Sequence, residues 1–253
     1  MIKYLLILLT FFSSEAYSQG FDWQVSTRHP YEITDLYIGV SSSFSYGAHT
    51  GDFPFLERDI VCCNYETGTG TGVQFGLASE YWYQNDLAFS VGLLYSNINS
   101  IYSTETTVLK KINPDLPAFN WITGYESDIT LEYISIDMAV KKRIYNKLNL
   151  KAGVDLNFNI GSEELHKNVV IEPANIPFAD GSFEKELTNG RVGDISTFLL
   201  GVSLGLSYDI NLGVERYGEI SLLTNYTVNS YINNNSWHSL QAKLTARAFL
   251  GIR

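Results

Sequence analysis

The sequence predicts an all-β protein, an eight-stranded antiparallel up-and-down transmembrane β-barrel. Three observations support this prediction: apolar and polar residues alternate in segments of about ten, the number of segments is even, and the connections are alternately short and long. The composition agrees, because the 253 residues include 17 Tyr, 14 Phe and 20 Gly but only 6 Pro. Such a composition favours strands over helices. One domain is expected for a chain of this length.

The N-terminus carries the features of an export signal. Lys3 precedes an apolar run at residues 4–12, and small residues at Ala16 and Ser18 form a cleavage site before Gln19. The run is too short to span a bilayer as a helix. We therefore expect a signal peptide at residues 1–18, a periplasmic segment at 19–34 and the barrel domain at 35–253.

The alternating segments define the strands. In the stretch "KLNLKAGVDLNFNIG" every second residue from Leu148 to Ile160 is apolar, and the residues between them are mostly polar. In an extended chain these two sets lie on opposite faces. Eight segments show this pattern: 36–45, 73–83, 87–96, 133–141, 147–161, 198–208, 219–228 and 240–252.

The connections distinguish a membrane barrel from a soluble one. Short turns are expected around Asn85, around Asn146 and at 211–216, whereas long loops are expected at 48–70, 98–128 and 162–194, with a shorter fourth loop at 232–239. Short turns at one end and long loops at the other are typical of barrels with periplasmic turns and extracellular loops. The barrel must close, because an open edge in lipid would leave backbone groups unpaired.

The polar face of the strands predicts a charge-paired interior. An eight-stranded barrel has room inside only for side chains, which suits the many Gly and Ser residues there. Because unpaired buried charges are costly, we expect ion pairs and a plugged barrel. The alternation places eight charged residues inside: Glu80, Asp137, Lys141, Lys151, Asp155, Glu219, Lys243 and Arg247. Five tyrosines near strand ends are expected to form interfacial girdles: Tyr81, Tyr83, Tyr95, Tyr208 and Tyr226.

The net charge of −10 is concentrated in the expected loops. The three long loops carry net charges of −3, −2 and −4. Acidic loops argue against nucleic-acid binding, which needs a basic face. They are suited to a surface partner or to divalent cations, which prefer carboxylate ligands. We expect outer-membrane lipid around a monomeric barrel and no cofactor.

Two local patterns leave chemistry open. Ser236, His238 and Ser239 lie together before the last strand, and the third loop holds Glu163, Glu164 and His166. Neighbouring residues such as His238 and Ser239 point to opposite faces of a strand, so this pattern argues against a catalytic pair and we expect no enzyme. The adjacent Cys62 and Cys63 could form a vicinal disulfide, stay reduced or link two molecules.

Taken together, the signal peptide and eight alternating strands resemble the small outer-membrane β-barrel proteins of Bacteroidota and related bacteria, similar to the OmpA transmembrane domain and the PorT-type barrels. The resemblance covers residues 35–253 and implies a bacterial outer-membrane location. It implies a structural or surface-interaction role, of which an accessory role in secretion is one form. The alternatives are an outer-leaflet lipid-modifying hydrolase and a soluble lipocalin-like binding barrel, whose strands would turn their apolar faces inward.

Overall fold

The computed structural model describes residues 36–57, 60–83, 86–111, 118–190, 194–213, 215–233 and 236–252, without the side chains of 52–57, 60–64 and 188–190. The predicted signal peptide at 1–18 and the segment at 19–34 lie outside this part of the chain. No helix within it is long and apolar enough to cross a membrane.

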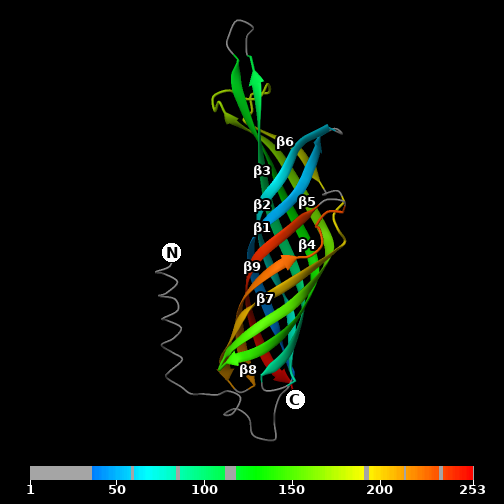
Figure 1. Cartoon of the computed structure of the whole chain (residues 1–253), viewed down its shortest axis with the longest axis vertical. Coiled ribbons are helices and arrows are strands. Elements are labelled where there is room, and N and C mark those ends of the chain that lie inside the picture. The colour runs from blue at the N-terminus through cyan, green and yellow to red at the C-terminus, as the bar shows by residue number, and fades with distance from the viewer. Residues whose placement is uncertain are drawn as a thin grey trace, which may run out of the picture.

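The described residues form nine antiparallel strands (Figure 1). They are β1 (Leu36–Glu57), β2 (Ile60–Trp82), β3 (Leu87–Lys110), β4 (Phe119–Tyr145), β5 (Leu148–Glu172), β6 (Glu184–Gly190), β7 (Phe198–Gly213), β8 (Arg216–Thr227) and β9 (Trp237–Ile252). Eight of them close a ring in the order β1–β2–β3–β4–β5–β7–β8–β9, and β9 returns to β1. Among the described strands, β6 pairs with β5 alone, at one end of the barrel. The predicted eight-stranded barrel is confirmed, with β6 as an addition.

The strands turn their apolar faces outward. Leu77 in β2 is 61% exposed, whereas Glu80 three residues later is fully buried. The same alternation runs along β3, β7 and β9. A soluble lipocalin-like barrel has the opposite arrangement, so that alternative is wrong.

The exposed apolar residues form a band around the barrel. On β1 the band runs from Leu36 to Tyr46. About eleven residues tilted by roughly 40° rise about 25 Å, which is the height of the apolar band of an outer-membrane barrel. Tyr81 and Tyr83 lie exposed near one end of the band, and Tyr226 lies exposed at the other. These positions match those expected of interfacial tyrosines.

The turns at one end are short, as predicted. β4 and β5 are joined by Asn146 and Lys147 alone, and Asn146 has a φ of 48°. Asn tolerates this left-handed conformation better than most residues. β7 and β8 are joined by two residues, and β2 and β3 by four.

The prediction of long loops at the other end is wrong, because the strands continue into these regions. β1 continues to Glu57 and β2 begins at Ile60, so most of the expected loop at 48–70 is a β-ribbon. β3 and β4 likewise pair out to Lys110 and Phe119, and β5 extends to Glu172. Beyond the apolar band water surrounds the outer face, so the sequence there no longer needs the strict alternation that marks a lipid-facing strand.

The extended strands form a projection beyond the band. We use this name for residues 103–110 of β3, 119–130 of β4, 161–172 of β5 and the whole of β6, which pair in this order. The ribbon of β1 and β2 leaves the barrel separately, and Figure 1 shows it in blue and cyan apart from the green ends of β3 and β4.

Candidate functional site

The interior of the apolar band holds a network of ion pairs centred on Lys141. Its ammonium nitrogen lies 2.8 Å from Glu80, 3.1 Å from Asp209 and 2.9 Å from Glu219. The four residues come from β2, β4, β7 and β8, and all are buried. The network therefore joins strands from opposite walls of the barrel.

A second set of contacts continues the network along the barrel axis. Lys151 lies 2.7 Å from Glu219, and Arg247 lies 2.8 Å from Asp137 and 3.8 Å from Glu219. Glu219 thus contacts three cations, because it also pairs with Lys141. This shared carboxylate connects β4, β5, β8 and β9.

Lys243 and Asp155 complete the set at longer range. The Lys243 ammonium lies 3.8 Å from Asp137 and 3.7 Å from Asp155. Asp155 also accepts a hydrogen bond from the amide of Asn225. All eight charged residues placed inside by the sequence are buried, and the structure brings them into one connected network.

Two members of the network were not among the expected residues. Arg143 lies 3.2 Å from Asp209 and stacks over the ring of Trp82 at 4.6 Å. The expected strands ended one residue before Asp209 and two before Arg143. The alternation could have found both, since Tyr208 faces outward and Lys141 faces inward. With them the described network contains five acids and five bases.

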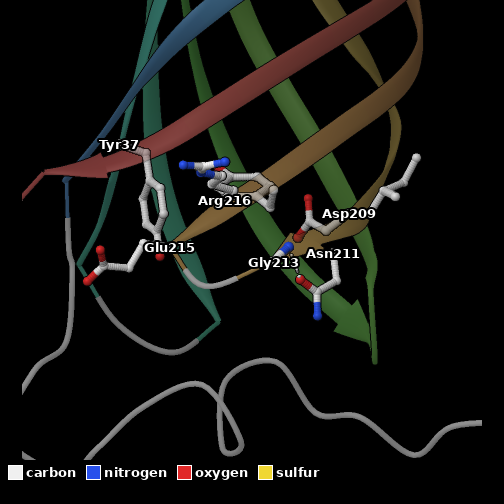
Figure 2. Close-up of a pocket in the computed structure, with 8 residues that line it drawn as sticks. Tyr37, Asp209, Asn211, Gly213, Glu215 and Arg216 are labelled. Atoms are coloured by element: carbon white, nitrogen blue, oxygen red, sulfur yellow. Dashed lines mark hydrogen bonds between the residues drawn. The ribbon is translucent and has the colours of Figure 1, made fainter.

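Aromatic residues close the interior at the end with short turns. Tyr217 packs edge-on against Tyr37 with 5.0 Å between ring centroids, and stacks on Phe249 at 4.9 Å. Its hydroxyl donates a hydrogen bond to Glu80. A cavity of about 20 Å³ lies at this mouth, and Tyr37, Asp209 and Arg216 are among the residues that line it (Figure 2). A cavity of this size holds about one water molecule.

Hydroxyl and amide groups fill the interior toward the other end of the band. The Ser96 hydroxyl lies 2.9 Å from that of Ser135, which donates to Asn157 at 2.6 Å. Gln74 donates to Ser96 at 2.6 Å, so the bonds link four strands. Small hydroxyl side chains suit an eight-stranded barrel, whose interior has little room.

At the end of the interior away from the short turns, the buried side chains are apolar and aromatic. We call this cluster the aromatic cap: Tyr65, Tyr102, Ile129, Leu131, Tyr133, Leu199, Tyr231, Ile232 and Trp237. His49 lies among these residues and is almost completely buried. The Trp237 indole donates a hydrogen bond to Nδ1 of His49 at 3.1 Å, and Nε2 of His49 lies 3.0 Å from the Ser100 hydroxyl. Burial lowers the pKa of His49 to about 4.

His166 lies above the cap with an acidic partner. Its Nε2 is 2.5 Å from Glu164, which also accepts a hydrogen bond from Ser127 at 3.2 Å. The ring of Tyr65 stacks on His166. Burial, followed by the charge of Glu164, raises the pKa of Tyr65. His166, Tyr65 and Ser127 are almost completely buried, so this group lies inside the barrel and not on its surface.

The other candidate residues are not brought together. His238 stacks on Tyr226, a residue of the outer face, with 6.0 Å between ring centroids. Ser239 is buried inside and lies 2.8 Å from Thr227. The backbone of Cys63 pairs with that of Phe55, but the side chains of Cys62 and Cys63 lie outside the described residues, and so do all three alternatives for this pair.

Comparison with known proteins assigns the fold to a family. The family described as "Outer membrane protein beta-barrel domain" matches residues 24–253, and the chain belongs to it. The protein is therefore a β-barrel of the bacterial outer membrane. No curated protein matches the chain.

Several solved structures are similar in fold at low identity. Neisserial surface protein A is 13% identical over 86% of this chain and 97% of its own, with a TM-score of 0.36. The attachment invasion locus protein Ail of Yersinia pestis is 11% identical over 85% and 99%, with a TM-score of 0.35. The outer membrane protease OmpT of Escherichia coli is 10% identical over 89% and 100%, with a TM-score of 0.39.

Proposed function

We propose that this barrel is a non-conducting, non-enzymatic anchor in the outer membrane and that its projection contacts a partner outside the cell. The observation that carries the proposal is the interior network of five acids and five bases. A hydrated pore needs an open path, whereas here ion pairs span the interior between opposite walls. The aromatic residues at both ends of the network also support a barrel without an open path.

The projection supports the surface-interaction part of the proposal. On β3 the apolar band ends near Tyr95, and the strand continues about fifteen residues to Lys110. At about 3.3 Å per residue this adds roughly 50 Å of strand beyond the band. A plugged membrane anchor does not need such an extension, and exposed strands are well suited to contact another molecule. The narrower resemblance to PorT-type barrels and an accessory role in secretion stay predictions.

Conductance across a planar bilayer tests the anchor. The purified protein is expected to give no current steps above the lipid background, although it migrates as a folded, heat-modifiable band on gels. Uniform current steps from the folded protein would overturn the proposal.

A shortened variant tests whether the projection is dispensable for the barrel. Ser103 pairs with Glu126, so residues 104–125 can be replaced by Asn-Gly, which favours a two-residue hairpin turn. The variant is expected to insert, to keep its heat-modifiable band and to stay silent in the bilayer. Failure to insert would assign the projection to barrel assembly and contradict the proposal.

A further inference from the structure

The hydrogen bonds of His49 in the aromatic cap assign its protonation state. The indole N–H of Trp237 donates to Nδ1 of His49, and an indole nitrogen can only donate. Nδ1 is therefore unprotonated, and the proton of the neutral ring is on Nε2, which donates to the Ser100 hydroxyl at 3.0 Å. The neutral ring thus satisfies both of its hydrogen-bond partners.

A protonated His49 is incompatible with this arrangement. Both ring nitrogens of an imidazolium are donors, so the N–H of Trp237 and the new N–H on Nδ1 would face each other across 3.1 Å. Flipping the ring does not restore the contact, because a flip exchanges Nδ1 with a carbon that cannot accept a hydrogen bond. The contact between His49 and Trp237 must therefore break when the ring becomes charged.

The surroundings of His49 supply no opposite charge. The titratable groups that face the ring are Tyr102 of β3 and Tyr231 of the segment between β8 and β9, with 5.9 and 5.7 Å between ring centroids. The pKa of each tyrosine is raised by burial, so both are neutral in acid. β2 presents Gly70 and β9 presents Trp237, neither of which titrates. Burial lowers the pKa of His49 to about 4, and no carboxylate among the described residues counteracts this effect.

His49 itself is held firmly in place. β1 is paired on both sides at this position, since His49 lies opposite Gly68 of β2 and Ser239 of β9. Its ring lies directly against the backbone of β2, because a Cβ atom added to Gly70 would be 2.5 Å from Nε2. The ring therefore has no room to move toward β2, and a loss of the contact must displace Trp237.

Trp237 is held less firmly than His49. It is the first residue of β9 and pairs with Gly51 of β1, but the pairing of β9 with β8 already ends at Leu240. On its other side Trp237 donates from its backbone to the Ser230 hydroxyl at 2.9 Å and accepts from the backbone of Tyr231 at 3.0 Å. Strand ends open at a lower free energy than residues inside a sheet.

We infer that the aromatic cap is an acid-sensitive closure, in which a charged His49 displaces Trp237 and opens the outer end of the interior to water. Trp237 packs against Tyr102 with 5.2 Å between ring centroids and against Tyr231 with 4.9 Å. Its displacement therefore removes a side chain that both of these rings contact. This inference goes beyond the proposed function and does not depend on it.

The test follows the indole N–H groups of the full chain in detergent micelles by NMR with ¹⁵N-labelled Trp. Hydrogen exchange into D₂O is measured relative to free indole at each pH, and Trp237→Phe identifies the resonance of Trp237. We expect Trp237 to be protected at pH 7.5 and to lose about tenfold or more of this protection by pH 3. The loss should follow the titration of the His49 ring, with a midpoint at about pH 4. The buried indole groups of Trp82 and Trp121 should stay protected.

His49→Gln is the matched control. Gln can accept a hydrogen bond from Trp237 and donate one to Ser100, but it does not titrate. We expect Trp237 of this variant to stay protected at pH 7.5 and at pH 3. The interior ion pairs are the same in both proteins, so any effect of acid on them appears equally in both. A heat-modifiable band verifies that the variant is folded.

Two results on the wild type alone would overturn the inference: a Trp237 that stays protected while His49 titrates, and a His49 that stays neutral down to pH 3. An equal loss of protection in His49→Gln would assign the opening to other groups and would also overturn it. Simultaneous loss at Trp82, Trp121 and Trp237 would show general unfolding in place of a local opening, with the same consequence.

Discussion

The interior of the barrel within the apolar band and the interior beyond it are built in opposite ways. Inside the band, Lys141 and Glu219 are buried while Leu77 and Phe75 face outward. Beyond the band, Trp237 and other apolar residues of the cap are buried, and the outer faces of the strands carry polar residues such as Thr69. The strands cross this boundary without interruption, so one backbone serves both arrangements.

The difference shows that the surrounding solvent decides which side of a strand is apolar. Lipid on the outside removes any penalty for exposed Leu and leaves the polar residues to the interior. Those residues must then satisfy one another, which the ion pairs accomplish. Water on the outside restores the usual preference, and the cap resembles the core of a soluble protein.

The largest expected effect comes from Lys141→Met. The substitution leaves Glu80, Asp209 and Glu219 buried near one another without their shared cation. Removing one partner of a buried charge network costs about 3–5 kcal/mol of unfolding free energy. Urea unfolding in detergent micelles, followed by Trp fluorescence, measures this loss.

Lys142→Met is the matched control, because Lys142 is the next residue and is exposed on the outer face. Its substitution is expected to change stability by less than about 0.5 kcal/mol. Equal losses for the two variants would contradict the view that the interior network stabilises the membrane part.

An intermediate effect is expected when an outward-facing residue is replaced by Lys inside the apolar band, in comparison with the same replacement beyond the band. Leu77 and Thr69 lie on the same outward face of β2, Leu77 inside the apolar band and Thr69 beyond it. Leu77→Lys should cost about 2–4 kcal/mol, because a charge then faces lipid. Thr69→Lys should be nearly neutral. Refolding into lipid vesicles at increasing urea measures the stability loss of each variant. Similar losses would contradict the placement of the end of the apolar band between Leu77 and Thr69.

The smallest expected effect is a pH dependence from His49, which lies beyond the band. Its pKa is lowered to about 4 in the folded protein, from 6.5 in the unfolded chain. The unfolded state therefore binds the proton first, so this contribution is complete above pH 6.5 and is lost as the pH falls toward 4. Between pH 7.5 and 5 the loss is about 2 kcal/mol.

Comparison with His49→Gln isolates this contribution. Gln can accept from Trp237 and donate to Ser100, but it does not titrate. Urea unfolding at the two pH values should give a steeper decrease for wild type than for the variant. A variant with the same decrease would show that His49 is not the source.

The membrane part of the fold was predictable from the sequence because lipid imposes a strict rule. Every second residue of a membrane strand faces lipid and must be apolar. Alternating runs that include Leu36, Val73 and Leu148 therefore mark their strands directly. The same rule assigned Lys151 and Arg247 to the interior. It failed for Asp209 and Arg143 only because the expected strands ended too early.

The projection was not predictable in the same way. Residues such as Thr104 and Glu126 face water or a partly open sheet, so either face accepts polar side chains and no period of two appears. Pairing with neighbouring strands keeps this part extended. The position of His49 beneath Trp237 was equally hidden, because the two residues lie 188 positions apart in the chain.

By itself, the sequence determined the number of membrane strands, their inward and outward faces and the short turns. Each of these follows from alternation along a single strand, which is a local property. Only the tertiary structure decided which charges pair, that Glu219 joins three cations, and that β2 and β3 separate beyond Tyr102. These features depend on the register between strands and on the point where neighbouring strands separate, and the alternation of one strand contains neither.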